Sequence, residues 1–296
     1  MTTAAYKFLP PACADRLRGL SLAVRKPVEG ALQGQHRSPH HGASVEFADY
    51  RQYTPGDPPN LIDWAVYART DRHVIRRFQQ ETNVRAHILL DTSESMGFRD
   101  LGAQSKLDFA CHLAAGLMFV LVSQSDAAGL TLFNDDIRQT LPPVGSLAGL
   151  RPLLLALENI TPAGRSRIDH ALHTVADQIQ RRSLVILISD LLQDPAEVIR
   201  GLQHLHHNKH EILVLQPLDA AELQLNFSGL ADLRELETGA RLAVNADELR
   251  EAYAQEVRRF LDELRRGCAG CLAEYHVLDT RQPVEDVLHK RLNRRK

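Results

Sequence analysis

Several features that would place a chain in a familiar class of protein are missing from this sequence. Its 296 residues carry a formal net charge of only −2, so no strong field favours nucleic acid or an anionic membrane. The longest apolar run covers residues 113–122, whereas a membrane-spanning helix needs roughly 20 apolar residues. Residues 1–16 lack the basic start and the apolar stretch of a secretory signal. We therefore expect a cytoplasmic protein that neither binds nucleic acid nor inserts into a membrane.

Cysteines and the common enzyme motifs are equally scarce. The four cysteines are unevenly spaced and do not form the pattern of a disulfide framework. The chain has no nucleotide-binding P-loop (G-x-x-x-x-G-K-[ST]), no serine-hydrolase elbow (G-x-S-x-G) and no zinc-peptidase motif (H-E-x-x-H). The sequence thus offers no ready enzymatic mechanism, and we predict no catalytic residues.

Two clusters of potential metal ligands have a structural interpretation. Cys268 and Cys271 form a C-x-x-C pair, but the pair follows a predicted helix, and the helix dipole disfavours a thiolate at that end. Without a second pair to complete a zinc site, we expect a packed turn. The histidines of the second cluster lie at the end of a predicted helix and in the loop after it, where we expect a solvated face. They are His204, His206, His207 and His210.

The character of the sequence changes near residue 82. Residues 1–82 are irregular and rich in turn-forming residues, with a single predicted helix at residues 14–25. From residue 83 onward, apolar runs that predict strands alternate with segments of helical periodicity. The predicted strands are residues 84–90, 129–133, 184–189, 211–216 and 272–278, and residues 233–237 and 241–244 predict a hairpin appended to the sheet.

This alternation predicts the fold class. Strands that alternate with helices form a parallel sheet covered on both faces, and the almost wholly apolar runs at residues 84–90 and 184–189 suit such burial. We predict a doubly wound, mostly parallel α/β domain of the Rossmann type at residues 83–296. Residues 1–82 would form an irregular N-terminal extension packed on that domain.

The most informative segment is the end of the first predicted strand. Residues 84–90 run directly into Asp91, and Ser93 and Ser95 follow at alternate positions. One carboxylate and two hydroxyls at this spacing are hard oxygen donors, which suit Mg²⁺ or Mn²⁺ better than a soft metal. The segment offers no obvious nucleophile–base pair, so it favours metal-assisted binding over catalysis.

Two more oxygen donors are predicted to lie at the same edge of the sheet. Ligands of open α/β sheets bind outside the carboxyl ends of the strands, and Asp190 follows the predicted strand at residues 184–189. Ser166 lies in a glycine-containing turn between the two strand ends in the sequence. The competing explanation is that such residues only cap the helices that follow them.

The order of these residues resembles a known metal site. Asp-x-Ser-x-Ser, then a Gly-x-Ser turn, then a strand-end aspartate is similar to the metal-ion-dependent adhesion site of von Willebrand factor A domains. The stretch before it resembles the signature of the bacterial domain of unknown function 58 family, whose members carry a von Willebrand factor A-like domain. The residues of that signature are His36, Arg37, Ser38, Gly42, Glu46, Phe47, Arg51, Tyr53, Pro55, Gly56, Asp57, Ile62, Asp63, Trp64, Ala68 and Arg69.

The resemblance implies a role for each oxygen donor. Asp91, Ser93 and Ser95 would be ligands from the first loop, and Asp190 would act through water or by orienting the others. Ser166 stands where the family usually has threonine, so the hydroxyl is kept but the methyl that restricts its rotamer is lost. Mg²⁺ binds six oxygens and gives up water reluctantly, so one position would remain open for a carboxylate from another protein.

The resemblance also implies a function. We expect a non-enzymatic interaction module that uses the metal site to bind an acidic residue of a partner. Members of the resembled family are often associated with MoxR-type AAA+ ATPases, which implies an adaptor in the assembly or remodelling of a client complex. Two alternatives remain open: a metal-dependent phosphoester hydrolase that uses the same oxygens, and a scaffold whose metal site is vestigial.

Overall fold

The structure is a computed structural model, and it describes residues 6–22, 45–54, 56–57, 59, 62–80, 84–225, 228–237 and 239–292. The chain divides into two units. The larger unit combines residues 1–26 with residues 84–296, and the smaller unit consists of residues 27–83. Residues 6–22, which the sequence placed in the N-terminal extension, thus belong with the α/β unit.

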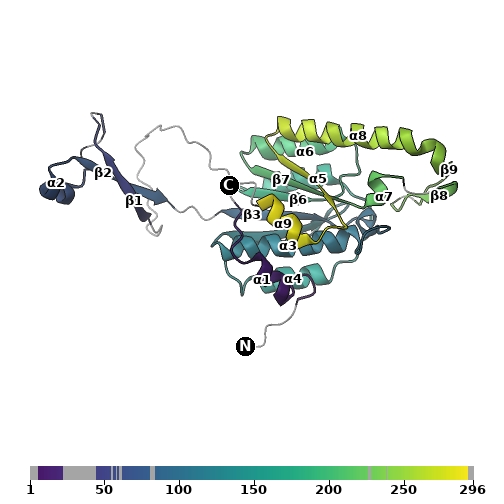
Figure 1. Ribbon diagram of the computed structural model, residues 1–296, viewed down its shortest axis with the longest axis horizontal. Helices are drawn as coiled ribbons and strands as arrows, with labels where there is room; N and C mark the ends of the chain where they lie inside the picture. The colour runs from purple at the N-terminus through teal and green to yellow at the C-terminus, as the bar shows by residue number, and fades with distance from the viewer. Residues whose placement is uncertain are drawn as a thin grey trace. The chain divides into compact units, whose positions relative to one another are not determined.

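The larger unit is built around a six-stranded sheet (Figure 1). Its strands lie side by side in the order β10 (Glu274–Asp279), β7 (Glu211–Leu218), β6 (Leu184–Ile188), β3 (Arg85–Asp91), β4 (Ala127–Phe133) and β5 (Ile137–Val144). Five of them are parallel, and the edge strand β5 runs antiparallel to β4. With β3 counted as the first strand, this order reads 6-5-4-1-2-3, which is the arrangement of a doubly wound fold. The predicted fold class is confirmed.

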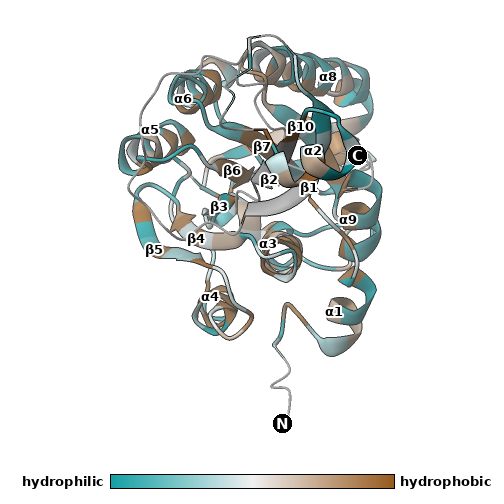
Figure 2. Ribbon diagram, turned by 90° about the vertical axis from the view of Figure 1, so that its left-hand side faces the viewer, coloured by the Kyte–Doolittle hydropathy of each residue, from teal (hydrophilic) through white to brown (hydrophobic). Residues whose placement is uncertain are grey.

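Helices cover both faces of this sheet, and each face has its own apolar core (Figure 2). One face is covered by α1 (Pro11–Leu17), α3 (Lys106–Ser123), α4 (Leu150–Glu158) and α9 (Val284–Leu292). The other face is covered by α5 (Ile168–Gln178), α6 (Pro195–His207) and α8 (Ala246–Gly270). Because β3 and β6 lie in the middle of the sheet, they are buried on both sides, which explains their almost unbroken apolar sequences.

The helix α3 is the centre of one of these cores. By length and composition it is apolar enough to cross a membrane, but 78% of it is buried inside the α/β unit. Its first turn is capped by Ser105, whose hydroxyl accepts a hydrogen bond from the backbone N–H of Asp108 at 3.1 Å. The helix begins at the edge of the sheet where β3 and β6 end, because its first residue, Lys106, contacts Asp190.

Three elements differ from the sequence-based expectations. The predicted helix at residues 14–25 instead spans Pro11–Leu17, because Pro11 suits a first helical position and the backbone is extended from Arg18. The strand β5 was not predicted, since its sequence is polar and contains two prolines, which an edge strand tolerates. The predicted hairpin forms from β8 (Leu230–Arg234) and β9 (Arg241–Asn245), but it is a separate two-stranded sheet and is not appended to the central one.

The smaller unit contains a two-stranded antiparallel sheet and a short helix, which the sequence pattern did not indicate. The strands are β1 (Val45–Gln52) and β2 (Val74–Gln80), and the helix is α2 (Trp64–Thr70). Polar contacts between residues close in the sequence connect these elements. The unit therefore combines these short-range contacts with the long-range pairing of its two strands, from Val45↔Gln80 to Gln52↔Val74.

Several residues of the family signature make these short-range contacts. Arg51 pairs with Asp57 at 2.9 Å, and the Asp63 carboxylate caps α2 by accepting hydrogen bonds from two backbone N–H groups of its first turn. Trp64 begins this helix with 57% of its surface exposed. The signature positions that lie outside the described residues are His36, Arg37, Ser38, Gly42 and Pro55.

Candidate functional site

Two neighbouring strands end in carboxylates at one edge of the sheet. The strand β3 ends at Asp91, and β6 is followed by Ser189 and Asp190. The two strands pair in parallel, so their carboxyl ends lie side by side. Both carboxylates are buried, Asp91 with no exposed surface and Asp190 with 1%. A buried carboxylate needs hydrogen bonds or a counter-charge, and these two meet that need in different ways.

Neutral donors surround the Asp91 carboxylate. Its Oδ1 accepts a hydrogen bond from the backbone N–H of Ser93 at 2.9 Å, and its Oδ2 accepts hydrogen bonds from the hydroxyls of Ser166 and Ser189, both at 2.7 Å. The hydroxyls of Ser93 and Ser95 lie 3.1 Å apart. The structure thus brings four of the five predicted residues together and adds Ser189, which we did not predict. We refer to these five residues, Asp91, Ser93, Ser95, Ser166 and Ser189, as the Asp91 cluster.

Backbone contacts hold the two loops of the Asp91 cluster together. The backbone N–H of Glu94 donates to the carbonyl of Gly164 at 2.9 Å, and that of Ala163 donates to the carbonyl of Thr92 at 3.0 Å. Gly164 has a φ of +75°, in the left-handed region that residues with a side chain rarely adopt. This glycine therefore lets the turn before α5 approach the end of β3 and present Ser166 to the cluster.

A buried lysine balances the charge of Asp190. The Nζ of Lys106 donates to Asp190 Oδ2 at 2.7 Å and to Oε1 of Glu222, in the short helix α7 (Ala220–Leu223), at 2.5 Å. The Lys106 side chain is only 1% exposed. We refer to Lys106, Asp190 and Glu222 as the Lys106 group. The sequence did not reveal it, because a lysine in the first turn of a helix is ordinarily solvated.

Burial and charge act in opposite directions on the pKa values of these groups. Burial, and secondarily the charge of Asp190, raises the pKa of Asp91 to about 6. Burial alone would lower the pKa of Lys106, but the charges of Asp190 and Glu222 outweigh it and raise that pKa. Burial raises the pKa of Glu222 although Lys106 opposes this, and the short contacts favour an ionised pair. Lys106 thus stays protonated, whereas the charge of Asp91 is poorly compensated.

A carboxylate of the β8–β9 hairpin also reaches the Asp91 cluster. Glu237 lies in the turn between β8 and β9, and its carboxylate lies close enough to the Ser95 side chain and to the backbone of Ser166 for both to lower its pKa. Burial raises the pKa of Glu237, and these two groups partly offset the effect. The chain thus places one of its own acidic side chains against two of the residues predicted to bind a metal. Nothing in the sequence pattern indicated this contact, which depends on how the hairpin folds back.

The chemistry of the Asp91 cluster fits a hard cation. Its side-chain donors are carboxylate and hydroxyl oxygens only, and Mg²⁺ and Mn²⁺ prefer oxygen ligands. Among the residues that the structure describes, no group of three or more His, Cys, Asp and Glu side chains is placed to hold a metal ion. A cation here would therefore rest on Asp91, on the serine hydroxyls and on water. Asp190 could join through Oδ1, since Lys106 contacts its Oδ2.

An open groove adjoins the Asp91 cluster. Its volume is about 630 Å³, and its lining includes Thr92, between Asp91 and Ser93 in the sequence, and Ala163, in the turn that carries Ser166. Arg138 of β5 and Leu155 of α4 also line it, so the walls combine polar and apolar side chains. A segment of another protein that reached the cluster would find room for its flanking residues there.

The cysteine pair and the histidine cluster do not form sites within the described part of the chain. Cys268 and Cys271 are both buried free thiols, and burial raises the pKa of Cys268 to about 12, as a packed turn requires. His210 is buried and accepts a hydrogen bond from the backbone N–H of Ser183 at 3.2 Å. Our expectation that His210 lies on a solvated face is therefore wrong, because the loop after α6 turns inward at this residue.

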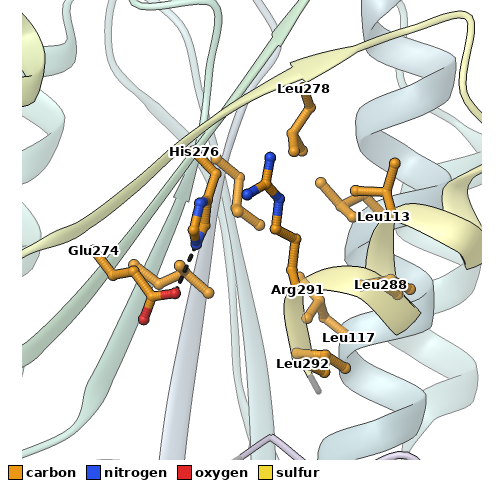
Figure 3. A pocket seen from close by; sticks show the side chains of 11 residues that line it. Leu113, Leu117, Glu274, His276, Leu278, Leu288, Arg291 and Leu292 are labelled. Atoms are coloured by element: carbon orange, nitrogen blue, oxygen red, sulfur yellow. Dashed lines mark hydrogen bonds and ion pairs between the residues drawn. The ribbon is translucent and has the colours of Figure 1, made fainter. Parts of the chain in front are cut away.

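A small cavity between α3, β7, β10 and α9 is a separate feature (Figure 3). Its volume of about 20 Å³ leaves room for about one water molecule. Figure 3 shows His276 beside Glu274, with which it pairs at 2.6 Å, and the leucines Leu113 and Leu288 on the opposite side. The cavity shares no lining residue with the Asp91 cluster, and it is too small to hold a substrate.

Comparison with known proteins places this chain among bacterial relatives. A family model described as protein of unknown function DUF58 matches residues 49–262. Proteins from Mycobacterium tuberculosis and Mycobacterium bovis, each described as uncharacterised, are 27% identical to this chain over 291 residues. The aligned region is 97% of this chain and 91% of each relative.

Similar solved structures cover about 70% of this chain. The protein BatB from Bacteroides thetaiotaomicron is 18% identical with a TM-score of 0.49, over 72% of this chain and 98% of that one. The VWA domain of SpRpn10 is 13% identical with a TM-score of 0.43, over 71% of this chain and 95% of that one. The family match spans parts of both units and includes Asp91, Ser166 and Asp190. The chain belongs to the family described as protein of unknown function DUF58.

Proposed function

We propose that this chain is a protein-interaction module that binds Mg²⁺ or Mn²⁺ at the Asp91 cluster and, through the ion, an acidic residue of a partner. The observation that carries the proposal is the convergence of Asp91, Ser93, Ser95 and Ser166 in one hydrogen-bonded cluster. The cluster lies at the carboxyl edge of a doubly wound sheet, where such folds bind their ligands. Its residues come from three segments that are distant in the sequence, at the ends of β3 and β6 and in the turn before α5, so simple helix capping does not account for their meeting.

The number of protein oxygens favours an open coordination position. Mg²⁺ takes six oxygen ligands in octahedral geometry, whereas the cluster offers one carboxylate and a few hydroxyls. The remaining positions are left to water, to Asp190 and to groups from outside. A partner carboxylate in one of these positions would form a charge-assisted contact with the ion, and the adjoining groove would receive the residues that flank it.

Glu237 supports the idea that this place accepts a carboxylate. Its carboxylate already lies close enough to Ser95 and to the backbone of Ser166 for both to lower its pKa. We propose that Glu237 occupies the position of the partner's acidic residue in the free protein. A partner would have to displace the hairpin turn, which lowers its affinity and restricts binding to strong or locally concentrated partners.

For the partner we propose a MoxR-type AAA+ ATPase or a client of such an ATPase, with this chain acting as an adaptor in the cytoplasm. The family resemblance is the basis for this choice of partner. An adaptor of this kind needs contacts that form and break, and a carboxylate held through an exchangeable ion meets that need.

A pull-down experiment tests the proposal. Immobilised wild-type protein should retain a MoxR-type ATPase or its client in Mg²⁺ and release it in chelator, and Asp91→Ala should retain neither. Asp135→Ala is the matched control, because Asp135 is an exposed carboxylate of the same sheet edge outside the cluster, and it should behave as the wild type. Equal retention by wild type and Asp91→Ala, or equal retention in chelator, would refute the proposal.

A further inference from the structure

Lys106 occupies a position that is unfavourable for a cation by itself. It is the first residue of α3, and the positive end of the helix dipole disfavours a lysine there. Its side chain is 1% exposed, and removing an ammonium group from water is costly unless it is paired. A lysine is retained in such a place only if the surrounding charges compensate for both effects.

The compensating charges are the carboxylates of Asp190 and Glu222, and Asp190 lies at the same edge of the sheet as the Asp91 cluster. Lys106 Nζ lies 2.7 Å from Asp190 Oδ2 and 2.5 Å from Glu222 Oε1, so two carboxylates from different connections converge on one ammonium group. Asp190 also repels Asp91, since its charge contributes to the raised pKa of Asp91. Three carboxylates therefore surround this edge of the sheet, and Lys106 is the cation placed among them.

The two oxygens of Asp190 are used differently. Oδ2 is taken by Lys106, whereas Oδ1 accepts, from the residues that the structure describes, only a long hydrogen bond from the backbone N–H of Leu192, at 3.4 Å. The amide of Gln216 fixes the backbone of Asp190 by donating to its carbonyl at 2.6 Å. Asp190 is thus held in place from one side while its other oxygen stays available to an ion.

We propose that Lys106 is a built-in counter-cation that holds Asp190 in its metal-binding position when no ion is present and weakens the binding of the ion when it arrives. This inference rests on the proposed function, because it concerns the same site. With Lys106 in place, the folded state does not need a divalent cation to offset the buried carboxylates. The lysine also repels an incoming ion and thereby weakens its binding. The ion can then leave and return, which lets the contact with a partner form and break.

The test measures thermal stability of the full chain in chelator and in saturating MgCl₂. Lys106→Met keeps the length of the side chain and removes its charge. We expect a large loss of melting temperature in chelator, a clear recovery in Mg²⁺, and a Mg²⁺ affinity by calorimetry that is raised roughly tenfold or more, since a unit charge a few ångströms away acts strongly inside a protein. Lys106→Arg, which keeps the charge, should resemble the wild type.

Two further variants make the result decisive. Lys7→Met removes the other lysine that forms an ion pair with α3, to Asp108 at 3.0 Å, but Lys7 is exposed, so its loss should leave the Mg²⁺ response unchanged. If Lys106→Met does not fold in chelator, the double variant Lys106→Met/Glu222→Gln takes its place in the experiment. The double variant has one buried negative charge fewer, so it needs less compensation. That variant should show the same enhanced response to Mg²⁺.

The outcomes separate this inference from the proposed function. Suppose that Mg²⁺ stabilises the wild type through Asp91, but that Lys106→Met loses the same melting temperature relative to the wild type in chelator and in Mg²⁺. Lys106 then has only a structural role, and the inference is overturned. If neither the wild type nor a folded Lys106 variant responds to Mg²⁺, the metal site itself is refuted, and the proposed function fails with it.

Discussion

The ends of β3 and β6 carry two carboxylates that are equally buried and differently stabilised. Asp91 accepts hydrogen bonds from hydroxyl and backbone N–H groups without a counter-charge, whereas Asp190 pairs with Lys106. Neutral donors leave much of a carboxylate's charge uncompensated, while an ion pair compensates it directly. The difference suits Asp91 for binding a cation and Asp190 for positioning the edge at which the cation binds.

The largest expected effect separates the two carboxylates by their contribution to folding. In chelator, Asp190→Asn should lower the free energy of unfolding by about 3 kcal/mol or more, because a buried lysine loses one of its charged partners. At neutral pH, Asp91→Asn should leave it unchanged or raise it, since the amide keeps an oxygen that accepts hydrogen bonds and the variant loses a buried charge that has no counter-charge. Urea unfolding of both variants measures the difference. Equal losses would show that the two strand ends are stabilised in the same way.

The second prediction concerns pH. The pKa of Asp91 in the folded state is about 6, above the value of about 4 expected when the chain is unfolded. The folded state therefore binds more protons between these values, and stability falls as pH rises from about 4 to about 6, by about 3 kcal/mol.

Asp91→Asn lacks the titrating group and serves as the control for this pH dependence. In chelator, the wild type should lose stability relative to Asp91→Asn across that interval and remain parallel to it above pH of about 7. A constant difference between the two proteins from pH 4 to pH 7 would contradict the assignment of an uncompensated charge to Asp91.

A third prediction concerns the β8–β9 hairpin, whose Glu237 lies beside the Asp91 cluster. Removing Glu237 should expose the position that we propose for a partner carboxylate. In Mg²⁺, a synthetic peptide with the sequence of residues 233–242 should bind Glu237→Ala about tenfold more tightly than it binds the wild type. In the variant, the peptide no longer competes with the protein's own Glu237 side chain. Fluorescence anisotropy of a labelled peptide measures both affinities.

Glu235→Ala is the matched control for the hairpin, because it removes a carboxylate from the same turn. It should leave the affinity of the peptide near that of the wild type. If Glu237→Ala and Glu235→Ala have the same effect, the net charge of the turn matters and the specific contact of Glu237 with the cluster does not.

The smallest expected effect comes from Ser166. Threonine at this position would restore the methyl group that restricts the rotamer of the hydroxyl, so Ser166→Thr should raise Mg²⁺ affinity by about two- to threefold. Calorimetric titration of the variant and the wild type measures the change. Ser189→Thr is the comparison on the neighbouring loop, and a gain of the same size there would mean that the effect is not specific to Ser166.

The sequence predicts the parts of this site that lie directly at strand ends. Apolar runs fix where β3 and β6 end, and the doubly wound topology then brings Asp91 and Asp190 to one edge. Ser166 was predicted from its glycine-containing turn between the two strand ends in the sequence, and the resemblance to a known metal site implies a hydroxyl there. The two apolar cores follow from the same hydrophobic pattern, whereas the order of the strands was not predicted.

The charges that neutralise or cover the site could not be predicted in this way. Lys106 lies in the first turn of a helix, where a lysine is usually solvated, and only the packing of α3 against β6 and α7 buries it. Glu237 reaches the cluster because a hairpin folds back over it, and no local pattern reports such a contact. Both depend on tertiary packing, which sequence periodicity does not encode.

Calorimetric titration of Mg²⁺ into the wild type and into Asp91→Ala tests the central claim most directly. The account predicts binding of one ion per chain to the wild type and no binding to Asp91→Ala, with circular dichroism showing that the variant is folded. An absence of heat in both proteins, or equal affinity in both, would contradict a metal site at the end of β3.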